Sequence, residues 1–83
     1  MDKKTKRRIR TDMAHLIIQT DFGTGSSSVS AMHGVAAVVD PDLRVDDGNN
    51  DVAQFNVLDA SESLMYLLPY WPAGTVFVSV VDP

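Results

Sequence analysis

The stretch LIIQTDFGTGSSSVSAMHG, residues 16–34, decides the fold, because it reads as a strand, a polar turn and the start of a helix. Residues 16–18 form a short apolar run of the kind found in strands that are buried on both faces. The turn at residues 21–28 is rich in glycine and hydroxyl side chains. Apolar residues then return at helical spacing: Val29, Met32, Val35, Ala36 and Val39. In open α/β sheets, ligands bind beyond the carboxyl ends of the strands, which makes Asp21 a candidate binding residue.

The first helix has clear start and stop signals. The apolar spacing predicts a helix over residues 27–39, with Ser26 or Ser27 as its N-cap. It ends before Pro41, because the residue that precedes a proline disfavours the helical conformation.

The rest of the chain continues the alternation of strand and helix. We expect a short strand at residues 43–45 and a second helix from Asn56, whose capping role is supported by Asp59 three positions later. The spacing predicts an apolar face on this helix: Val57, Ala60, Ser61, Leu64 and Leu68. The helix ends at the Pro69-Tyr70-Trp71-Pro72 run, whose aromatic rings we expect to close the base of the sheet, with a ligand wall as the alternative. Residues 75–81, TVFVSVV, are the strongest strand signal in the chain.

The element order is therefore β-α-β-α-β, which predicts an α/β fold. Right-handed crossovers make the three strands parallel and place the helices on the faces of the sheet. The first strand then runs into Asp21, the second into Asp46 and Asp47, and the third into Asp82. Clustered carboxylates repel one another, so they fit a site where a polyhydroxyl or cationic ligand lies between them. We interpret Asp21 and Asp82 as functional, and Asp46 and Asp47 as ordinary turn residues.

Length and composition are those of one small globular domain: 83 residues, 45% hydrophobic and 22% charged. The chain has no cysteine, which excludes disulfides and thiolate metal sites. His15 and His33 have no partners at ligand spacing, so no metal site is predicted, and we expect His33 on the solvated side of its helix. No apolar run approaches the length of a membrane span and nothing argues for secretion, so we expect a cytoplasmic protein with no membrane partner.

Positive charge is concentrated at the N-terminus. Six of the seven Lys and Arg residues lie in residues 1–10, whereas residues 11–83 hold Arg44 and ten acids, a balance of −9. An acidic body argues against nucleic-acid binding by the folded part. We interpret residues 1–13 as a disordered, solvated leader. Two alternatives stay open: a patch for RNA or anionic lipid, and a start of translation at Met13.

Several motifs of this chain resemble those of the S-adenosyl-L-methionine hydroxide adenosyltransferase family. They span nearly all of residues 14–83: Thr20-Asp21-Phe22-Gly23, Met32-His33-Gly34-Val35, Asp40-Pro41-Asp42, Pro72-x-Gly74-Thr75-Val76 and Val80-Val81-Asp82-Pro83. Members displace methionine from the ribose 5′ carbon of S-adenosyl-L-methionine. Water or hydroxide as nucleophile gives adenosine, and in the related fluorinating and chlorinating enzymes a halide gives a 5′-halo-5′-deoxyadenosine. The resemblance implies a hydrolase whose substrate is S-adenosyl-L-methionine and which needs no cofactor.

The resemblance implies roles for five residues. Asp21 matches the aspartate that holds both ribose hydroxyls, a bidentate and charge-assisted contact. Ser28 matches a position near the methionine portion, and Phe55 matches an aromatic position beside the sugar. Thr75 is counted among the substrate-binding positions and begins the strand that leads to Asp82. Asp82 is the implied catalytic residue, because a carboxylate orients and polarises water but repels a halide, and halogenating relatives typically carry tyrosine there.

The chain also departs from the family pattern. The family reads Asp-x-x-His after the second strand, whereas Asp47-Gly48-Asn49-Asn50 carries no histidine, and one extra residue precedes Phe55. Asn56 stands where aspartate is common, and Ser26 stands where an acidic residue often lies near the substrate ammonium. The family continues past the matched region into a glycine-rich loop, an arginine, a histidine and a β-rich second domain that contacts adenine across a trimer interface.

We therefore expect residues 14–83 to be the first half of a Rossmann-like three-layer N-terminal domain, which forms a homotrimer in full-length members. We expect no turnover from these residues alone, and whether the chain by itself is an enzyme stays open. The alternatives are a truncated or decayed fragment and a small nucleoside-binding module. For the latter, the Gly23-x-Gly25-x-x-Ser28 spacing imitates a dinucleotide fingerprint but lacks its third glycine.

Overall fold

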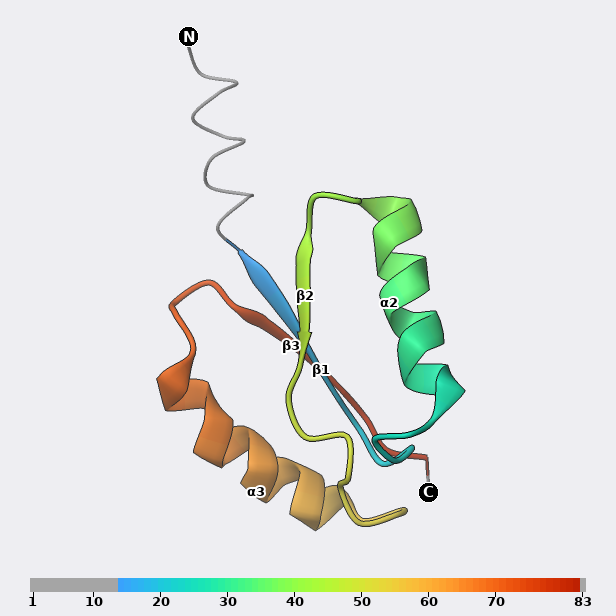
Figure 1. Ribbon diagram of the computed structural model, residues 1–83. Coiled ribbons are helices and arrows are strands. Elements are labelled where there is room, and N and C mark those ends of the chain that lie inside the picture. The colour runs from blue at the N-terminus through green and yellow to red at the C-terminus, as the bar shows by residue number, and fades with distance from the viewer. Residues whose placement is uncertain (1–13, 83) are drawn as a thin grey trace, which may run out of the picture.

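The first strand of the chain is the central strand of the sheet in the computed structural model, which describes residues 14–82 (Figure 1). The strands are all parallel and lie in the order β2-β1-β3. This confirms the predicted α/β class. The predicted leader, residues 1–13, lies outside the described residues. The elements in chain order are β1 (His15–Thr20), α2 (Ser27–Val39), β2 (Arg44–Asp47), α3 (Val57–Leu67), the 3-10 helix η1 (Leu68–Tyr70) and β3 (Val76–Val80).

The two α-helices lie on opposite faces of the sheet, which gives three layers (Figure 1). The chain steps from β1 to β2 in one direction and then crosses back over β1 to reach β3. Because right-handed crossovers in opposite directions put their helices on opposite faces, α2 and α3 enclose β1 between them. Successive β1 side chains follow this division. Ile18 lines a cavity with Met32 of α2, whereas Ile17 lies with Leu67 of α3 around Gly48.

Burial is concentrated in the second half of β1. Ile17 and Ile18 are almost completely buried, and so is the polar side chain of Gln19. The Nε2 of Gln19 donates to the Ala60 carbonyl of α3 at 3.0 Å and to Ser79 Oγ of β3 at 2.8 Å, whereas its buried Oε1 has no hydrogen-bond partner within residues 14–82. A buried amide with these partners ties the central strand to a helix and to a neighbouring strand.

Both helices begin at the predicted caps. Ser26 accepts from the Ser28 N–H at the start of α2, and Asn56 accepts from the Asp59 N–H at the start of α3. The second half of the expected capping box is different, because Asp59 Oδ2 accepts from the Ala53 N–H at 2.8 Å. The carboxylate of Asp59 therefore fixes the loop before the helix.

The inward face of α3 differs at both ends from the predicted one. Ala60 is buried as expected, but Ser61 is exposed, and Val57 and Leu68 are 60% and 51% exposed. Leu67 takes the inward position instead, beside Ile17. The chain tightens into η1 at Leu68, and this change of helical pitch removes Leu68 from the α-helical spacing.

Of the two aromatic residues expected to close the base of the sheet, Trp71 does so, whereas Tyr70 is 73% exposed and packs on Tyr66. The Trp71 ring lies 5.3 Å from the His15 ring, centroid to centroid, at the start of β1. The first strand and the end of the α3–η1 unit are thus packed together.

The two aspartates expected after the second strand lie inside it. β2 extends to Asp47, and Asp47 is in register with Ile18, two residues before the end of β1. Asp47 Oδ1 lies 2.8 Å from His33 Nε2, and the His33 side chain is 35% exposed, so the histidine predicted to be solvated is only partly so and lies against the end of β2. Asp46 Oδ2 lies 3.9 Å from His15 Nε2. Both carboxylates therefore face histidines along the sheet and do not join Asp21.

The α2 side of the sheet contains an apolar cavity of about 290 Å³, lined by β1, β3, α2 and Leu43. Val35, which lines this cavity, is 66% exposed, and Val38, which is not part of the lining, is 85% exposed. Within residues 14–82, no helix combines the length and the apolar character that crossing a membrane requires.

The Ile17→Ala variant tests the packing of β1. Ile17 is fully buried, so its truncation leaves a cavity and is expected to lower the free energy of unfolding by about 3 kcal/mol in urea titrations. Val38→Ala is the matched control, because Val38 is 85% exposed and its truncation should change stability by less than about 0.5 kcal/mol. Equal losses in the two variants would contradict the assignment of the core.

Candidate functional site

Asp21, at the carboxyl end of β1, joins the other two segments that reach this end of the sheet. The residue is 5% exposed. Its Oδ2 accepts the Phe55 N–H at 2.9 Å and the Asp82 N–H at 3.3 Å, and its own N–H donates to the Val80 carbonyl at 3.2 Å. The structure therefore brings together Asp21, Phe55 and Asp82 from three separate stretches of sequence.

The two oxygens of the Asp21 carboxylate have different surroundings. Oδ2 takes both backbone donors, whereas Oδ1 accepts no hydrogen bond from any other residue in the range 14–82. A buried carboxylate is costly without hydrogen bonds, and charge-assisted bonds of this kind contribute roughly 1.5–3 kcal/mol each. The backbone donors thus hold the carboxyl group in one orientation and leave Oδ1 for a further donor.

Phe55 has an unusual backbone. Its φ is 63°, in the left-handed region, while its side chain is 61% exposed. A non-glycine residue in this region costs about 1 kcal/mol or more, and such strain is concentrated at functional sites. In this conformation the Phe55 N–H donates to Asp21, and the Phe55 ring is exposed at the surface.

Asn50 is a buried residue that the sequence did not identify as part of this region. Its Oδ1 accepts from Thr20 Oγ1 at 3.0 Å, and its carbonyl accepts from the Gly23 N–H at 2.9 Å. Thr20 Oγ1 in turn accepts from the Phe22 N–H at 3.1 Å. From its buried position, Asn50 holds the turn after β1 through its side chain and its carbonyl. Its one signal in the sequence is its place at the histidine position of the Asp-x-x-His pattern.

Asp51 anchors the same turn from the surface, and it was also missed. Its Oδ1 accepts the Thr24 N–H at 2.9 Å, and its Oδ2 accepts from Thr24 Oγ1. These two hydrogen bonds, that from the Thr24 hydroxyl first, hold the pKa of Asp51 below its ordinary value of 3.8. In the sequence, Asp51 belongs to a polar cluster that indicates only a turn.

The two remaining predicted residues lie in different places. Ser28 is exposed in the first turn of α2, with its N–H on Ser26 Oγ at 3.1 Å, just after the turn that follows Asp21. Thr75 lies at the other end of β3, where its hydroxyl donates to the Pro72 carbonyl at 2.7 Å. At the rise of a strand, Thr75 and Asp82 are roughly 20 Å apart, so the structure does not bring Thr75 to this site.

The chemistry available here is that of carboxylates, backbone and one exposed ring. A fixed carboxylate oxygen suits a pair of hydroxyl donors, and neighbouring aspartates favour a cationic ligand over an anionic one. Within residues 14–82, no three His, Asp or Glu side chains gather in a way that could hold a metal ion.

Comparison with known proteins gives a family match over this whole region. The model of the SAM hydroxide adenosyltransferase N-terminal domain matches residues 16–83. The chain is 31% identical over 80 residues to the (R)-S-adenosyl-L-methionine hydrolase of Methanocaldococcus jannaschii, covering 90% of this chain and 30% of that protein. It is 41% identical over 64 residues to the enzyme of the same name from Salinispora arenicola, covering 77% of this chain and 24% of that protein.

A solved structure has the same fold. An uncharacterized conserved protein from Thermotoga maritima superposes with a TM-score of 0.77 at 33% identity, over 81% of this chain and 26% of the other. The chain thus spans 24–30% of the length of these similar proteins.

Phe55 offers a direct test of backbone strain. Phe55→Gly and Phe55→Ala both remove the ring, but only glycine adopts a positive φ without cost, so Phe55→Gly should be the more stable of the two by about 1 kcal/mol in urea unfolding. The same pair at the exposed helical residue Leu58 is the control, where glycine should be less stable than alanine by about 1 kcal/mol. The same sign at both positions would refute the strain.

The lowered pKa of Asp51 predicts that the turn held by its hydrogen bonds to Thr24 loosens at low pH. Because its pKa is lowered in the folded state, its stabilising contribution is present above the unfolded pKa and is lost as the pH falls through the folded value. Between about pH 5 and pH 2, the Thr24 amide proton should shift and exchange faster in NMR spectra. The change should be absent in Asp51→Asn, and a Thr24 amide that ignores pH in the wild-type chain would exclude this role.

Proposed function

This chain belongs to the SAM hydroxide adenosyltransferase family, and from that premise we propose that it forms part of a site that hydrolyses S-adenosyl-L-methionine to adenosine and L-methionine. The single observation that carries the proposal is the Asp21 carboxylate with the Asp82 and Phe55 N–H groups on one of its oxygens. The names of the matched relatives support the same reaction.

In this proposal Asp21 binds the ribose. Its Oδ2 is held by two backbone donors, so the free Oδ1 accepts from the vicinal hydroxyls in a fixed direction, and Oδ2 can share one of them. The exposed ring of Phe55 covers one side of the sugar. Ser28 contacts the methionine portion from the start of α2. Thr75 lies just before β3, at the end of that strand opposite Asp82, so this proposal gives it no contact with the substrate.

Asp82 orients the attacking water. The water oxygen forms a bond to the 5′ carbon while the carbon–sulfur bond breaks. The electron pair of the carbon–sulfur bond stays on sulfur, and methionine leaves as a neutral thioether. The surplus proton of the water passes to a base, and we assign that role to the Asp82 carboxylate. The sulfonium charge of the substrate is favoured near two aspartates, whereas a halide nucleophile would be repelled by them.

The same proposal includes the domain, the oligomeric state and the compartment in which the site works. Residues 14–83 act as the first half of the N-terminal domain, and full-length members act as homotrimers in the cytoplasm. The second candidate function is nucleoside binding without hydrolysis. It is supported by Asp21 Oδ1, which accepts no hydrogen bond from any other residue in the range 14–82 and could receive the ribose hydroxyls without any role for Asp82.

A chimera separates these two functions. We expect no adenosine from S-adenosyl-L-methionine with the chain alone, measured by chromatography. Residues 16–82 placed in the matching region of the Salinispora arenicola enzyme should restore adenosine release, and Asp82→Asn in that chimera should lower the rate about 100-fold or more.

Asp42→Asn, which changes an exposed acid in the turn between α2 and β2, is the control and should leave the rate unchanged. A folded chimera without activity would favour nucleoside binding alone. Full activity in the Asp82→Asn chimera would remove Asp82 from the mechanism.

A further inference from the structure

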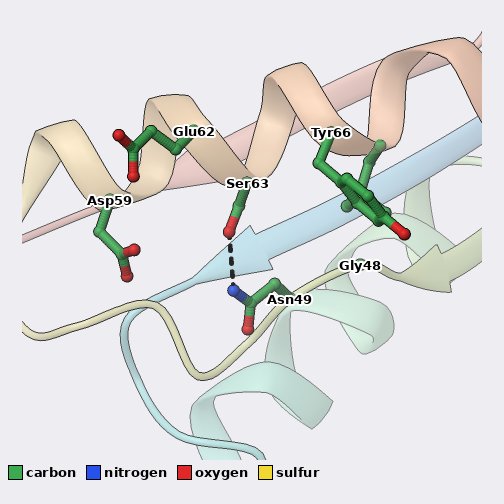
Figure 2. Close-up of a pocket in the computed structure, with 7 residues that line it drawn as sticks. Gly48, Asn49, Asp59, Glu62, Ser63 and Tyr66 are labelled. Carbon is green, nitrogen blue, oxygen red and sulfur yellow. Dashed lines mark hydrogen bonds between the residues drawn. The ribbon is translucent and has the colours of Figure 1, made fainter.

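A second pocket, of about 400 Å³, opens between α3 and the loop that follows β2 (Figure 2). Its lining includes none of Asp21, Phe55 and Asp82, so it is separate from the candidate site. The residues that matter for its chemistry come from two segments: Asp59, Glu62, Ser63 and Tyr66 from α3, and Gly48 and Asn49 from the loop.

Most polar groups of this pocket are already engaged. Asn49 Nδ2 donates to Ser63 Oγ at 2.9 Å, as Figure 2 shows, and Asp59 Oδ2 accepts from the Ala53 N–H. Glu62, by contrast, has no hydrogen bond and no ion pair with any other residue in the range 14–82, and it is exposed. The pocket therefore carries two negative charges, one of them on a side chain free to take a partner.

An aromatic ring stands one helical turn from Glu62. Tyr66 is 68% exposed, and its ring lies 5.5 Å from that of Tyr70. A carboxylate beside an aromatic face attracts cations, and arginine best of all, because its planar guanidinium both pairs with carboxylates and stacks on rings. Arg44 is the one Lys or Arg within residues 14–82, and it does not line the pocket.

The chain itself supplies cations close to this position. Residues 1–10 contain six Lys and Arg residues against a single acid. The described chain starts beside Trp71, through the His15 contact, and Trp71 follows the end of α3 that carries Tyr66. Glu62 lies nine residues before Trp71, about 14 Å at the rise of a helix, whereas the six residue-to-residue steps from Arg8 to Ala14 can span up to about 20 Å.

We propose that the basic segment, residues 3–10, docks on this pocket of its own chain, with Arg7 or Arg8 between Glu62 and Tyr66. The charges are complementary, the distance can be spanned, and the pocket offers both a carboxylate and a ring. The contact is electrostatic and near the surface, so it weakens as salt shortens the Debye length from about 10 Å at 0.1 M to about 3 Å at 1 M.

A spin label tests this proposal in the full chain. The sequence has no cysteine, so Thr5→Cys gives one attachment point for a nitroxide. Amide signals of Gly48, Ser63 and Tyr66 should broaden selectively in NMR spectra, and the broadening should fade in about 1 M salt. Glu62→Lys should abolish it. Asp42→Lys, an equal charge change on the α2 side, should not.

Several outcomes would overturn the proposal. Broadening that is uniform, that centres on the acidic turn at residues 40–42, or that persists in Glu62→Lys would exclude docking on this pocket. In a second sample, nitroxide-labelled chain is mixed with an equal amount of isotope-labelled chain that carries no nitroxide. If the signals of the isotope-labelled chain broaden as strongly as within the nitroxide-labelled chain itself, the contact is between molecules and not within one. If anionic vesicles or RNA bind the basic segment and the pocket signals are insensitive to the label, the segment serves those ligands.

Discussion

One carboxylate oxygen holds together the end of the sheet on which the proposed function depends. Asp21 Oδ2 accepts from Phe55 and from Asp82, residues that lie 34 and 61 positions further along the chain. The oxygen is buried and charged, so the cost of leaving it without donors is what fixes the loop before α3 and the end of β3 against β1. Apolar side chains could pack in the same space, but they would leave the Phe55 and Asp82 N–H groups without this acceptor.

The rest of the site follows from this constraint. Phe55 takes a left-handed backbone conformation with its N–H on Asp21, and its ring is left exposed. The turn after β1 is held separately, by the buried residue Asn50 and by the exposed residue Asp51. The binding surface is therefore built mostly from backbone and short polar side chains at strand ends. A fold of this kind can keep one oxygen of its central carboxylate free for a ligand.

The periodic parts of the fold were readable in the sequence, and the long-range polar contacts were not. The apolar run before Asp21 and the caps at Ser26 and Asn56 gave the elements, because each depends on neighbours in sequence. Convergence of Asp21 and Asp82 followed from parallel strands. Asp47, however, extends the second strand and pairs with His33, and Asn50 and Asp51 bind the turn after β1, since these partners are distant in sequence and leave no local pattern. Thr75 and Asp82 lie at opposite ends of β3 and are therefore far apart. The resemblance to the family does not indicate this distance, because it compares sequence positions and not positions in space.

The most direct test of this account is a crystal structure of the chain grown with adenosine. The account predicts that the 2′ and 3′ hydroxyls of the ribose lie within hydrogen-bond distance of the Asp21 carboxylate, with Oδ2 still bonded to the Phe55 and Asp82 N–H groups and the 5′ carbon toward Asp82. A nucleoside bound elsewhere, or an Asp21 side chain that points away from the end of β3, would contradict it.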